Sequence, residues 1–203
     1  MALINVAARE IHGKIVYYGP GLCGKTTNLQ YIHGKIPQGT KGDLLSIATE
    51  TERTLFFDYF PLSMGNIGGF RVKVDFFTVP GQSFYNATRR AVLEGVDGIV
   101  FVADSQPDRE EANLSSRDDM VRNLELTHRK LSDIPHVYQW NKRDAHGALK
   151  ESLLQRQLNP EGAPAIAATA VHGVGVWETQ GLILRQVFES LRHQDGRSTG
   201  QHA

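Results

Sequence analysis

The sequence has a single cysteine, Cys23, among its 203 residues. An internal disulfide is therefore excluded, and we expect a protein of the reducing cytoplasm. No apolar run approaches the roughly 20 residues that a membrane-spanning helix needs. Residues 1–13, MALINVAAREIHG, lack the basic and apolar regions of a secretory signal, and neither end carries a lipidation motif. We therefore expect no signal peptide and no direct membrane insertion.

The sequence also lacks an excess of charge of either sign. Lys and Arg number 22, Asp and Glu number 22, and the formal net charge at pH 7 is zero. Because no overall field would attract nucleic acid or an anionic membrane, we expect neither as a direct partner. Hydrophobic residues make up 40% of the chain and charged residues 22%, as in ordinary soluble proteins. This length suffices for one domain with a continuous core.

Apolar, β-rich segments alternate with helix-like segments along the chain. The predicted strands are residues 14–18 (KIVYY), 54–60 (TLFFDYF), 70–79 (FRVKVDFFTV), 98–104 (GIVFVAD), 136–140 (HVYQW) and 163–169 (APAIAAT). The alternation predicts an α/β fold, with a six-stranded, mostly parallel sheet and helices on both faces. The turn-rich PLSMGNIGG joins the second and third strands as a hairpin, so one edge strand is expected to be antiparallel.

Two helices are predicted from apolar periodicity in the second half of the chain. Met120, Leu124 and Leu131 recur at spacings of four and seven in DDMVRNLELTHRKL, which predicts an amphipathic helix. A closing helix is predicted from the apolar face formed by Ile183, Leu184, Val187, Phe188 and Leu191. With no internal repeat and no linker, residues 1–193 are assigned to one domain. The polar tail, residues 194–203, is expected to be disordered.

The segment GPGLCGKT, residues 19–26, matches the phosphate-binding pattern G-x-x-x-x-G-K-[ST]. It lies between the predicted strand KIVYY and the helix-like KTTNLQYIHGK, the context in which this pattern binds phosphate. Backbone N–H groups of such a loop, with the positive end of the following helix, hold anions. We expect Lys25 to bind the β- and γ-phosphates and the Thr26 hydroxyl to ligate Mg²⁺. The predicted nucleotide contacts here are Gly19, Gly21, Leu22, Cys23, Gly24, Lys25, Thr26 and Thr27.

Two simpler interpretations of this loop stay open. It could be a glycine turn with an incidental lysine, although its flanking strand and helix argue against that. Cys23 could act as a redox sensor. A loop position whose backbone binds the phosphates explains Cys23 equally well.

The segment NKRD, after the predicted strand HVYQW, predicts guanine as the base. The Asp144 carboxylate can accept two hydrogen bonds from N1–H and the 2-amino group of guanine, whereas adenine offers no such pair of donors. Asn141 is expected to bridge the base and the phosphate loop, and the stem of Lys142 to lie over the base. Downstream, Ala170 and Val171 follow another predicted strand and are expected to place a backbone N–H against guanine O6.

The segment TVPGQ, residues 78–82, ends the hairpin. Gly81 lets a backbone N–H approach the γ-phosphate, and Gln82 is placed to orient the attacking water. Upstream, Thr54 is expected to complete the Mg²⁺ shell when triphosphate is bound. Arg53 could stabilise the charge of the transition state, or it could be an exposed loop arginine. The expected catalytic residues are Gln82, Arg53 and Lys25, and the expected Mg²⁺ ligands are Thr26 and Thr54.

Several segments closely resemble the MglA family of bacterial Ras-like GTPases. They are KIVYYGPGLCGKTTNLQYI, TERTLFF, FFTVPGQSFYNATRR, GVDGIVFVADSQ and NKRD. The resemblance is dense from about residue 3 to 145 and looser to about 192. Thr78 is a family mark, because most Ras-like proteins carry aspartate there.

This resemblance implies a Ras-like P-loop GTPase domain that binds GTP, GDP and Mg²⁺ and acts as a switch in cell polarity or motility. It implies polarity or motility effectors, and recruitment to a cell pole through partners. It also implies an activating partner like MglB, a Roadblock-fold homodimer that supplies no arginine finger. The arginine would come from the GTPase itself, which favours the catalytic interpretation of Arg53.

Other classes of function stay open on the residues alone. A non-hydrolysing GTP-binding scaffold would carry the same phosphate and base ligands. An ATP-dependent phosphate-loop enzyme would need an acceptor pocket, and NKRD argues against it. The aromatic hairpin, with Phe56, Phe57 and Tyr59, predicts a partner surface at a sheet edge, although about half of these side chains must face the core.

Overall fold

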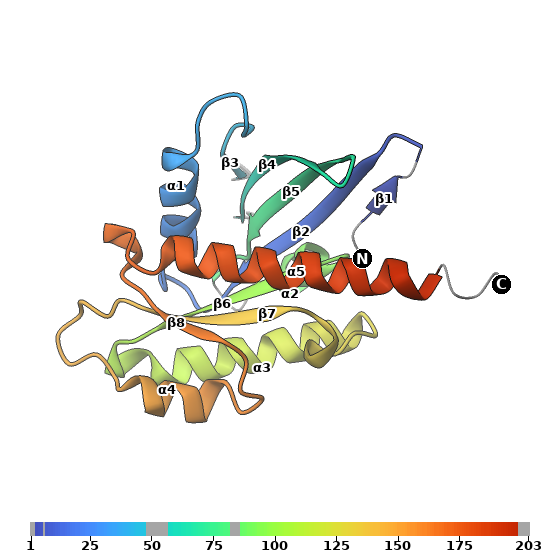
Figure 1. The fold of residues 1–203 in the computed structure, drawn as a ribbon. Coiled ribbons are helices and arrows are strands. Elements are labelled where there is room, and N and C mark those ends of the chain that lie inside the picture. Colours follow the sequence, from blue (N-terminus) through green and yellow to red (C-terminus); the bar gives the residue numbers. More distant parts are fainter. Residues whose placement is uncertain (1–2, 6, 48–56, 82–85, 199–203) are drawn as a thin grey trace.

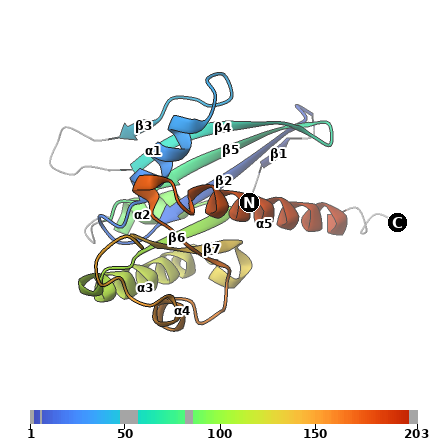
Figure 2. The ribbon, with the colours of Figure 1, turned by 60° about the vertical axis from the view of Figure 1, so that its left-hand side comes forward.

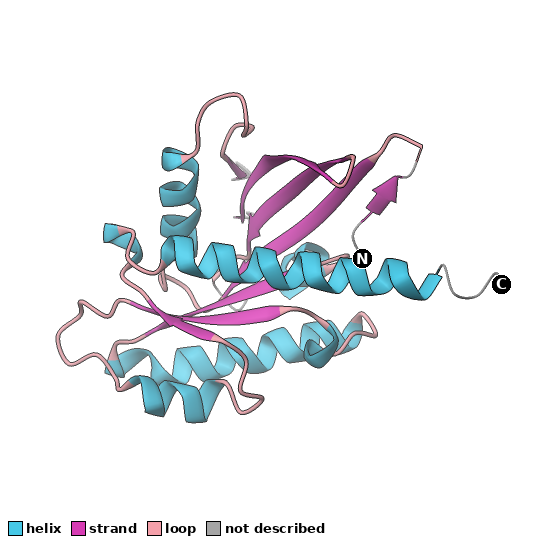
Figure 3. Ribbon diagram, in the orientation of Figure 1, coloured by secondary structure: helices cyan, strands magenta, loops and turns pink. Residues whose placement is uncertain are grey.

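The structure is a computed structural model that describes residues 3–5, 7–47, 57–81 and 86–198 (Figure 1). Three predicted functional residues, Arg53, Thr54 and Gln82, lie outside the described residues. Phe56 of the aromatic hairpin also lies outside them. A twisted sheet runs through the centre of the molecule, and helices lie on both of its sides (Figure 3).

One sheet contains all of the strands in the described residues. They are β1 (Leu3–Asn5), β2 (Glu10–Tyr18), β3 (Leu45–Ile47), β4 (Phe57–Ile67), β5 (Phe70–Thr78), β6 (Gly98–Asp104), β7 (His136–Asn141) and β8 (Ala165–Ala167). The order is β3-β4-β5-β2-β6-β7-β8, and β1 pairs with β2 outside this path. Strands β5, β2, β6, β7 and β8 are parallel to their neighbours in that order. The pairs β3–β4, β4–β5 and β1–β2 are antiparallel.

The α/β class and the mostly parallel sheet are confirmed. Each of the six predicted strands has a counterpart in the structure, as β2 and β4 to β8. The described part of the chain adds β1 and β3, so its sheet has eight strands, and β3 rather than β4 is the antiparallel edge strand. Both added strands have three residues, which is too short to produce a recognisable alternation of apolar and polar positions.

The α-helices in the described residues are α1 (Lys25–Lys35), α2 (Asn86–Leu93), α3 (Glu110–Leu126), α4 (Glu151–Leu158) and α5 (Val176–Ser198). The structure also has the 3₁₀ turns η2 (Pro107–Arg109), η3 (Leu131–Asp133) and η4 (Ala170–His172). Helices α2 and α4, of eight residues each, were not predicted. The predicted helix through Leu131 was wrong at its end. Helix α3 stops at Leu126, and His128 then takes a left-handed φ of 57°, which a helix cannot continue through.

Helix α5 includes the predicted apolar face and continues to Ser198. It therefore contains residues 194–198 of the tail that we expected to be disordered, and the last five residues lie outside the described part. Apolar residues stop near Leu191, so periodicity gave no sign of this extension. Among the described residues, no helix combines the length and apolarity needed to cross a bilayer.

The core consists of two apolar clusters, one on each face of the sheet. Strand β2 supplies both, because Ile15 and Tyr17 face one cluster while Val16 and Tyr18 face the other, and all four are fully buried. Helices α1 and α5 cover the first face. Helices α2, α3 and α4 cover the second, with α3 and α4 side by side (Figure 2). The loops after the parallel strands are thereby held at one edge of the sheet, where α/β proteins bind ligands.

Packing of α5 on the sheet generates a prediction about Gly98 of β6. A Cβ at Gly98 would lie 2.6 Å from Cγ2 of Val187 and 3.1 Å from the Ile183 side chain, so Gly98→Ala forces these side chains, or α5 with them, to move. We expect the free energy of unfolding, measured in urea, to fall by about 1–3 kcal/mol. Gly34→Ala in α1 is the control, because nothing lies within 4 Å of the added Cβ. It should raise stability by about 0.5–1 kcal/mol, and equal losses from both changes would contradict the packing argument.

Candidate functional site

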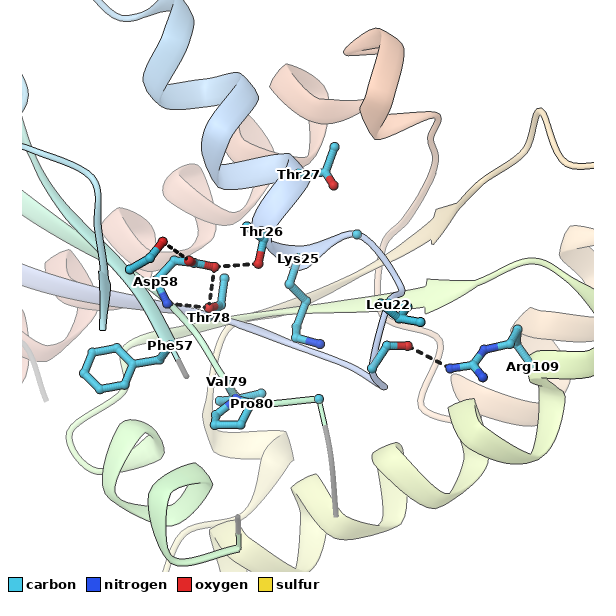
Figure 4. A pocket seen from close by; sticks show the side chains of 14 residues that line it. Leu22, Lys25, Thr26, Thr27, Phe57, Asp58, Thr78, Val79, Pro80 and Arg109 are labelled. Atoms are coloured by element: carbon cyan, nitrogen blue, oxygen red, sulfur yellow. Dashed lines mark hydrogen bonds between the residues drawn. The ribbon is translucent and has the colours of Figure 1, made fainter. Parts of the chain in front are cut away.

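The phosphate loop lies between β2 and α1 and lines a pocket of about 690 Å³ (Figure 4). This volume is in the range of small-ligand sites. Seven predicted residues line it: Gly21, Leu22, Gly24, Lys25, Thr26, Thr27 and Gly81. Gly19 and Cys23, also predicted as contacts, do not line it. The structure thus brings Thr78–Gly81, at and just after the end of β5, to the phosphate loop.

A second pocket, of about 320 Å³, adjoins the first. It is lined by all of the predicted base contacts: Asn141, Lys142, Asp144, Ala170 and Val171. Both pockets share Leu22, Gly24 and Thr27, so the phosphate loop forms a wall of each. Segments far apart in the sequence therefore meet at one continuous site.

Lys25 extends from the start of α1 into the first pocket (Figure 4). Its Nζ donates hydrogen bonds to the carbonyls of Gly19, at 2.9 Å, and Pro20, at 2.6 Å, and lies 3.7 Å from the Cys23 sulfur. Burial lowers the pKa of this lysine, because a desolvated ammonium ion is disfavoured. An anion in the pocket would offset that cost, as expected of a phosphate-binding lysine.

Burial raises the pKa of the Cys23 thiol, whose side chain is fully buried. Redox-sensing cysteines have the opposite character, with a lowered pKa and an accessible thiolate. The structure therefore favours the interpretation in which Cys23 serves the loop through its backbone.

Three hydroxyl groups converge on Asp58, a buried residue of β4 (Figure 4). Thr26 donates to Oδ2 of Asp58 at 2.6 Å, Thr78 donates to the same oxygen at 3.0 Å, and Ser46 donates to Oδ1 at 2.7 Å. The backbone N–H of Asp58 in turn donates to the Thr78 hydroxyl at 2.7 Å. This cluster fixes the Thr26 hydroxyl beside a carboxylate at the floor of the pocket.

Asp58 is a site residue that the sequence reasoning missed. A lone carboxylate within the aromatic segment TLFFDYF was one available signal, and Thr78 in place of the usual aspartate was a second. Hydroxyl and carboxylate oxygens are the ligands that Mg²⁺ prefers, so Thr26 and Asp58 together could hold this ion. Thr54, the other predicted ligand, lies outside the described residues.

Asn141, at the end of β7, joins the phosphate loop to the segment that contains Ala170. Its buried side chain donates from Nδ2 to the Cys23 carbonyl at 2.7 Å and accepts at Oδ1 from the Ala170 N–H at 2.9 Å. Gly24 lies against it with a φ of 102°, and a Cβ there would be 2.2 Å from Nδ2 of Asn141. Glycine is therefore required at this position, both for its backbone angle and for space.

Asp104, fully buried at the end of β6, organises charges between the two pockets. Its Oδ2 forms an ion pair with Nζ of Lys142 at 2.7 Å and lies 3.8 Å from Nε of Arg109. Arg109 also donates from Nη2 to the Gly21 carbonyl at 2.7 Å (Figure 4). Neither Asp104 nor Arg109 was predicted. A carboxylate at the carboxyl end of a buried parallel strand was the signal available for Asp104.

The backbone at Gly81 lies directly on the phosphate loop. A Cβ at Gly81 would come within 2.3 Å of the Gly21 Cα, so only glycine fits this contact. The preceding carbonyl, of Pro80, accepts a hydrogen bond from Nε of buried Arg89 in α2 at 2.9 Å. Arg89 is paired with Asp119 of α3. The end of TVPGQ is thus positioned up to Gly81, and Gln82 lies outside the described residues.

Comparison of the sequence with known proteins places this chain in a family. The mutual gliding-motility protein MglA of Myxococcus xanthus (strain DK1622) is 50% identical to this chain over 192 residues. The match covers 95% of this chain and 98% of that protein. No protein-family model matches the chain.

The hydroxyl cluster generates a prediction about Asp58. Asp58→Ala would remove the acceptor shared by the hydroxyls of Thr26, Ser46 and the buried Thr78, so we expect the free energy of unfolding to fall by about 1–3 kcal/mol. Urea denaturation of the purified protein measures this. Asp108→Ala is the control, because Asp108 is exposed, and its effect should stay within about 0.5 kcal/mol. Indistinguishable losses would mean that the cluster contributes nothing.

Proposed function

This chain belongs to the MglA family, and we propose that it is a molecular switch that binds guanine nucleotide and hydrolyses GTP to GDP and phosphate. The observation that supports this most strongly is the meeting of two motifs at one site. The phosphate loop and NKRD line adjoining pockets that share Leu22, Gly24 and Thr27. A nucleotide spanning both pockets would place its phosphates at Lys25 and its base at Asp144.

Guanine selectivity would come from Asp144. Its carboxylate is exposed and lines the base-side pocket, where it is available to accept two hydrogen bonds from the guanine edge. Adenine would leave it without those donors. Ala170 and Val171 line the same pocket and would supply a backbone N–H to O6.

On the phosphate side, Lys25 and the loop N–H groups would bind the β- and γ-phosphates. Mg²⁺, when bound by Thr26, Asp58 and, in the triphosphate state, Thr54, would neutralise part of the phosphate charge. Gln82 would orient the attacking water and Arg53 would stabilise the transition state. An arginine finger contributes 10³–10⁵ in rate in this class, about 4–7 kcal/mol.

Switching would follow from contacts that depend on the γ-phosphate. Without it, residues 39–54 and 78–90 would lose a shared anchor and relax. A partner that reads these segments could then distinguish GTP from GDP. The same partner could order Arg53 and Gln82, so we expect hydrolysis to be slow without it.

We further propose an MglB-like Roadblock-fold dimer as activator, and motility or polarity effectors as readers of the switch. The Myxococcus xanthus relative is described as a gliding-motility protein, which supports this role. A candidate contact surface is formed by Phe57, Tyr59 and Phe77, half-buried aromatics on β4 and β5 whose rings lie 4.8–6.1 Å apart. The protein would act in the cytoplasm and reach a cell pole through such partners.

Two other functions explain fewer of the site residues. A GTP-binding scaffold without hydrolysis would use the same two pockets, and it differs only in the role of Gln82 and Arg53. An ATP-dependent enzyme would not explain Asp144 at the base-side pocket.

Guanine binding is tested directly by denaturing the purified protein and identifying the released nucleotide by chromatography. Calorimetry of nucleotide-free protein should show heat with GDP and GTP and none with ADP or ATP. Asp144→Asn should weaken GDP binding about 100-fold, because the negative charge is lost and one of the two acceptor oxygens of the carboxylate becomes an N–H donor. Asp133→Asn, an exposed surface change, should bind as the wild type. Equal heat from adenine and guanine nucleotides would refute the proposal.

Hydrolysis is tested by single-turnover assays with an MglB-like activator. Arg53→Ala should slow the stimulated rate by about 10³-fold or more, and Gln82→Leu should slow it strongly, because each removes a transition-state contact. Both variants should keep GTP affinity. Arg122→Ala, an exposed arginine on α3, is the control and should leave the rate unchanged. Unchanged turnover in both test variants would favour the scaffold.

A further inference from the structure

A second set of buried polar side chains lies beneath the two pockets without lining either. It consists of Asn28 in α1, Gln139 in β7 and Thr179 in α5, all fully buried. In a core between sheet and helices, such positions are usually apolar. The burial of three polar residues from three separate elements therefore requires an explanation.

Every side-chain hydrogen-bond donor in this set has an acceptor, either in the set or on the backbone. The amides of Asn28 and Gln139 pair reciprocally, with Nδ2 to Oε1 at 2.8 Å and Nε2 to Oδ1 at 2.9 Å. The second N–H of Gln139 donates to the Thr179 hydroxyl at 3.0 Å. Every amide hydrogen and the hydroxyl hydrogen has an acceptor, so loss of one member leaves others buried and unpaired.

The ends of this network are two backbone carbonyls, one in the phosphate loop and one just before α5. The second N–H of Asn28 donates to the Gly24 carbonyl of the phosphate loop at 2.9 Å. At the other end, the Thr179 hydroxyl donates to the Gly175 carbonyl at 2.6 Å, just after the segment that contains Ala170. Gln139, in the middle, precedes Asn141 by two residues on β7.

We propose that the Asn28–Gln139–Thr179 network positions the phosphate loop relative to the base-side loops, and so sets nucleotide affinity without touching the nucleotide. This inference rests on the proposed guanine-nucleotide binding. A fully paired polar network adds little net stability over an apolar core of equal shape, but its hydrogen bonds are directional. Its contribution is a defined distance and angle between Gly24 and Gly175, which apolar packing would not specify.

The test compares release of a fluorescent GDP analogue from variant proteins. The double variant Asn28→Leu/Gln139→Leu removes the network and leaves no amide unpaired between the two positions. We expect it to release the analogue about tenfold faster or more, in the range of couplings between sites. Thr179→Val, which keeps the side-chain shape, should release it several-fold faster, and Thr179→Ser, which keeps the hydroxyl, should behave as the wild type.

Asn159→Leu is the matched control. Asn159 is also a buried asparagine whose side chain makes two hydrogen bonds, to the Ala163 carbonyl and from the Ala163 N–H, but it directly follows α4 and lines neither pocket. It should lower stability in urea and leave the release rate unchanged. Equal acceleration by this control would show that general destabilisation is responsible, and would overturn the proposal.

Two further outcomes are decisive. If the double variant does not fold, Thr179→Val decides, and a wild-type release rate from it overturns the proposal. Amide hydrogen exchange needs no nucleotide, so it tests the network even if the proposed nucleotide binding is wrong. Faster amide exchange in residues 24–28 on Thr179→Val, with none in Asn159→Leu, supports the network even if the wild type binds no guanine nucleotide. If the wild type binds no guanine nucleotide, unchanged amide exchange in Thr179→Val refutes the network.

Discussion

The site depends on holding the phosphate loop in one conformation from outside, because a loop that presents its N–H groups to an anion cannot use them to hold itself. The carbonyls of Gly21, Cys23 and Gly24 are therefore bound by residues outside the loop, while Lys25 binds those of Gly19 and Pro20. Arg109 binds the Gly21 carbonyl, Asn141 binds the Cys23 carbonyl and Asn28 binds the Gly24 carbonyl. Gly81 packs on Gly21. The rest of the fold can be understood as the support for these contacts.

That support is rigid because the central strands are buried on both faces. Strand β2 contributes to both apolar clusters, and β6 is buried along its whole length. Close packing leaves few alternative positions for the loops that follow these strands. The polar residues at their ends, Asp104 on β6 and Asn141 on β7, can therefore be buried and paired with little adjustment. A site of charged and polar groups is thus built on an apolar framework.

Local patterns predicted much of this molecule. Six of the eight strands in the described residues, helix α1 and the motifs GPGLCGKT and NKRD follow from short segments whose residue types have one physical explanation. Helices α2 and α4 were missed because eight residues contain too few apolar positions for a clear period. The end of α3 was misplaced because Leu131 continues the apolar spacing although it lies in a separate turn. Asp58 was missed because its partners, Thr26 and Thr78, come from other elements.

The sequence by itself determined the fold class, the phosphate loop and the motif expected to select guanine, because each is encoded by neighbouring residues. Only the tertiary structure decided which distant groups meet. It placed Asp58 against Thr26, Asp104 between Lys142 and Arg109, and Gln139 between Asn28 and Thr179. Such contacts depend on strand order and helix packing, and hydrogen bonds act over about 3 Å whatever the separation along the chain. No local pattern carries that information.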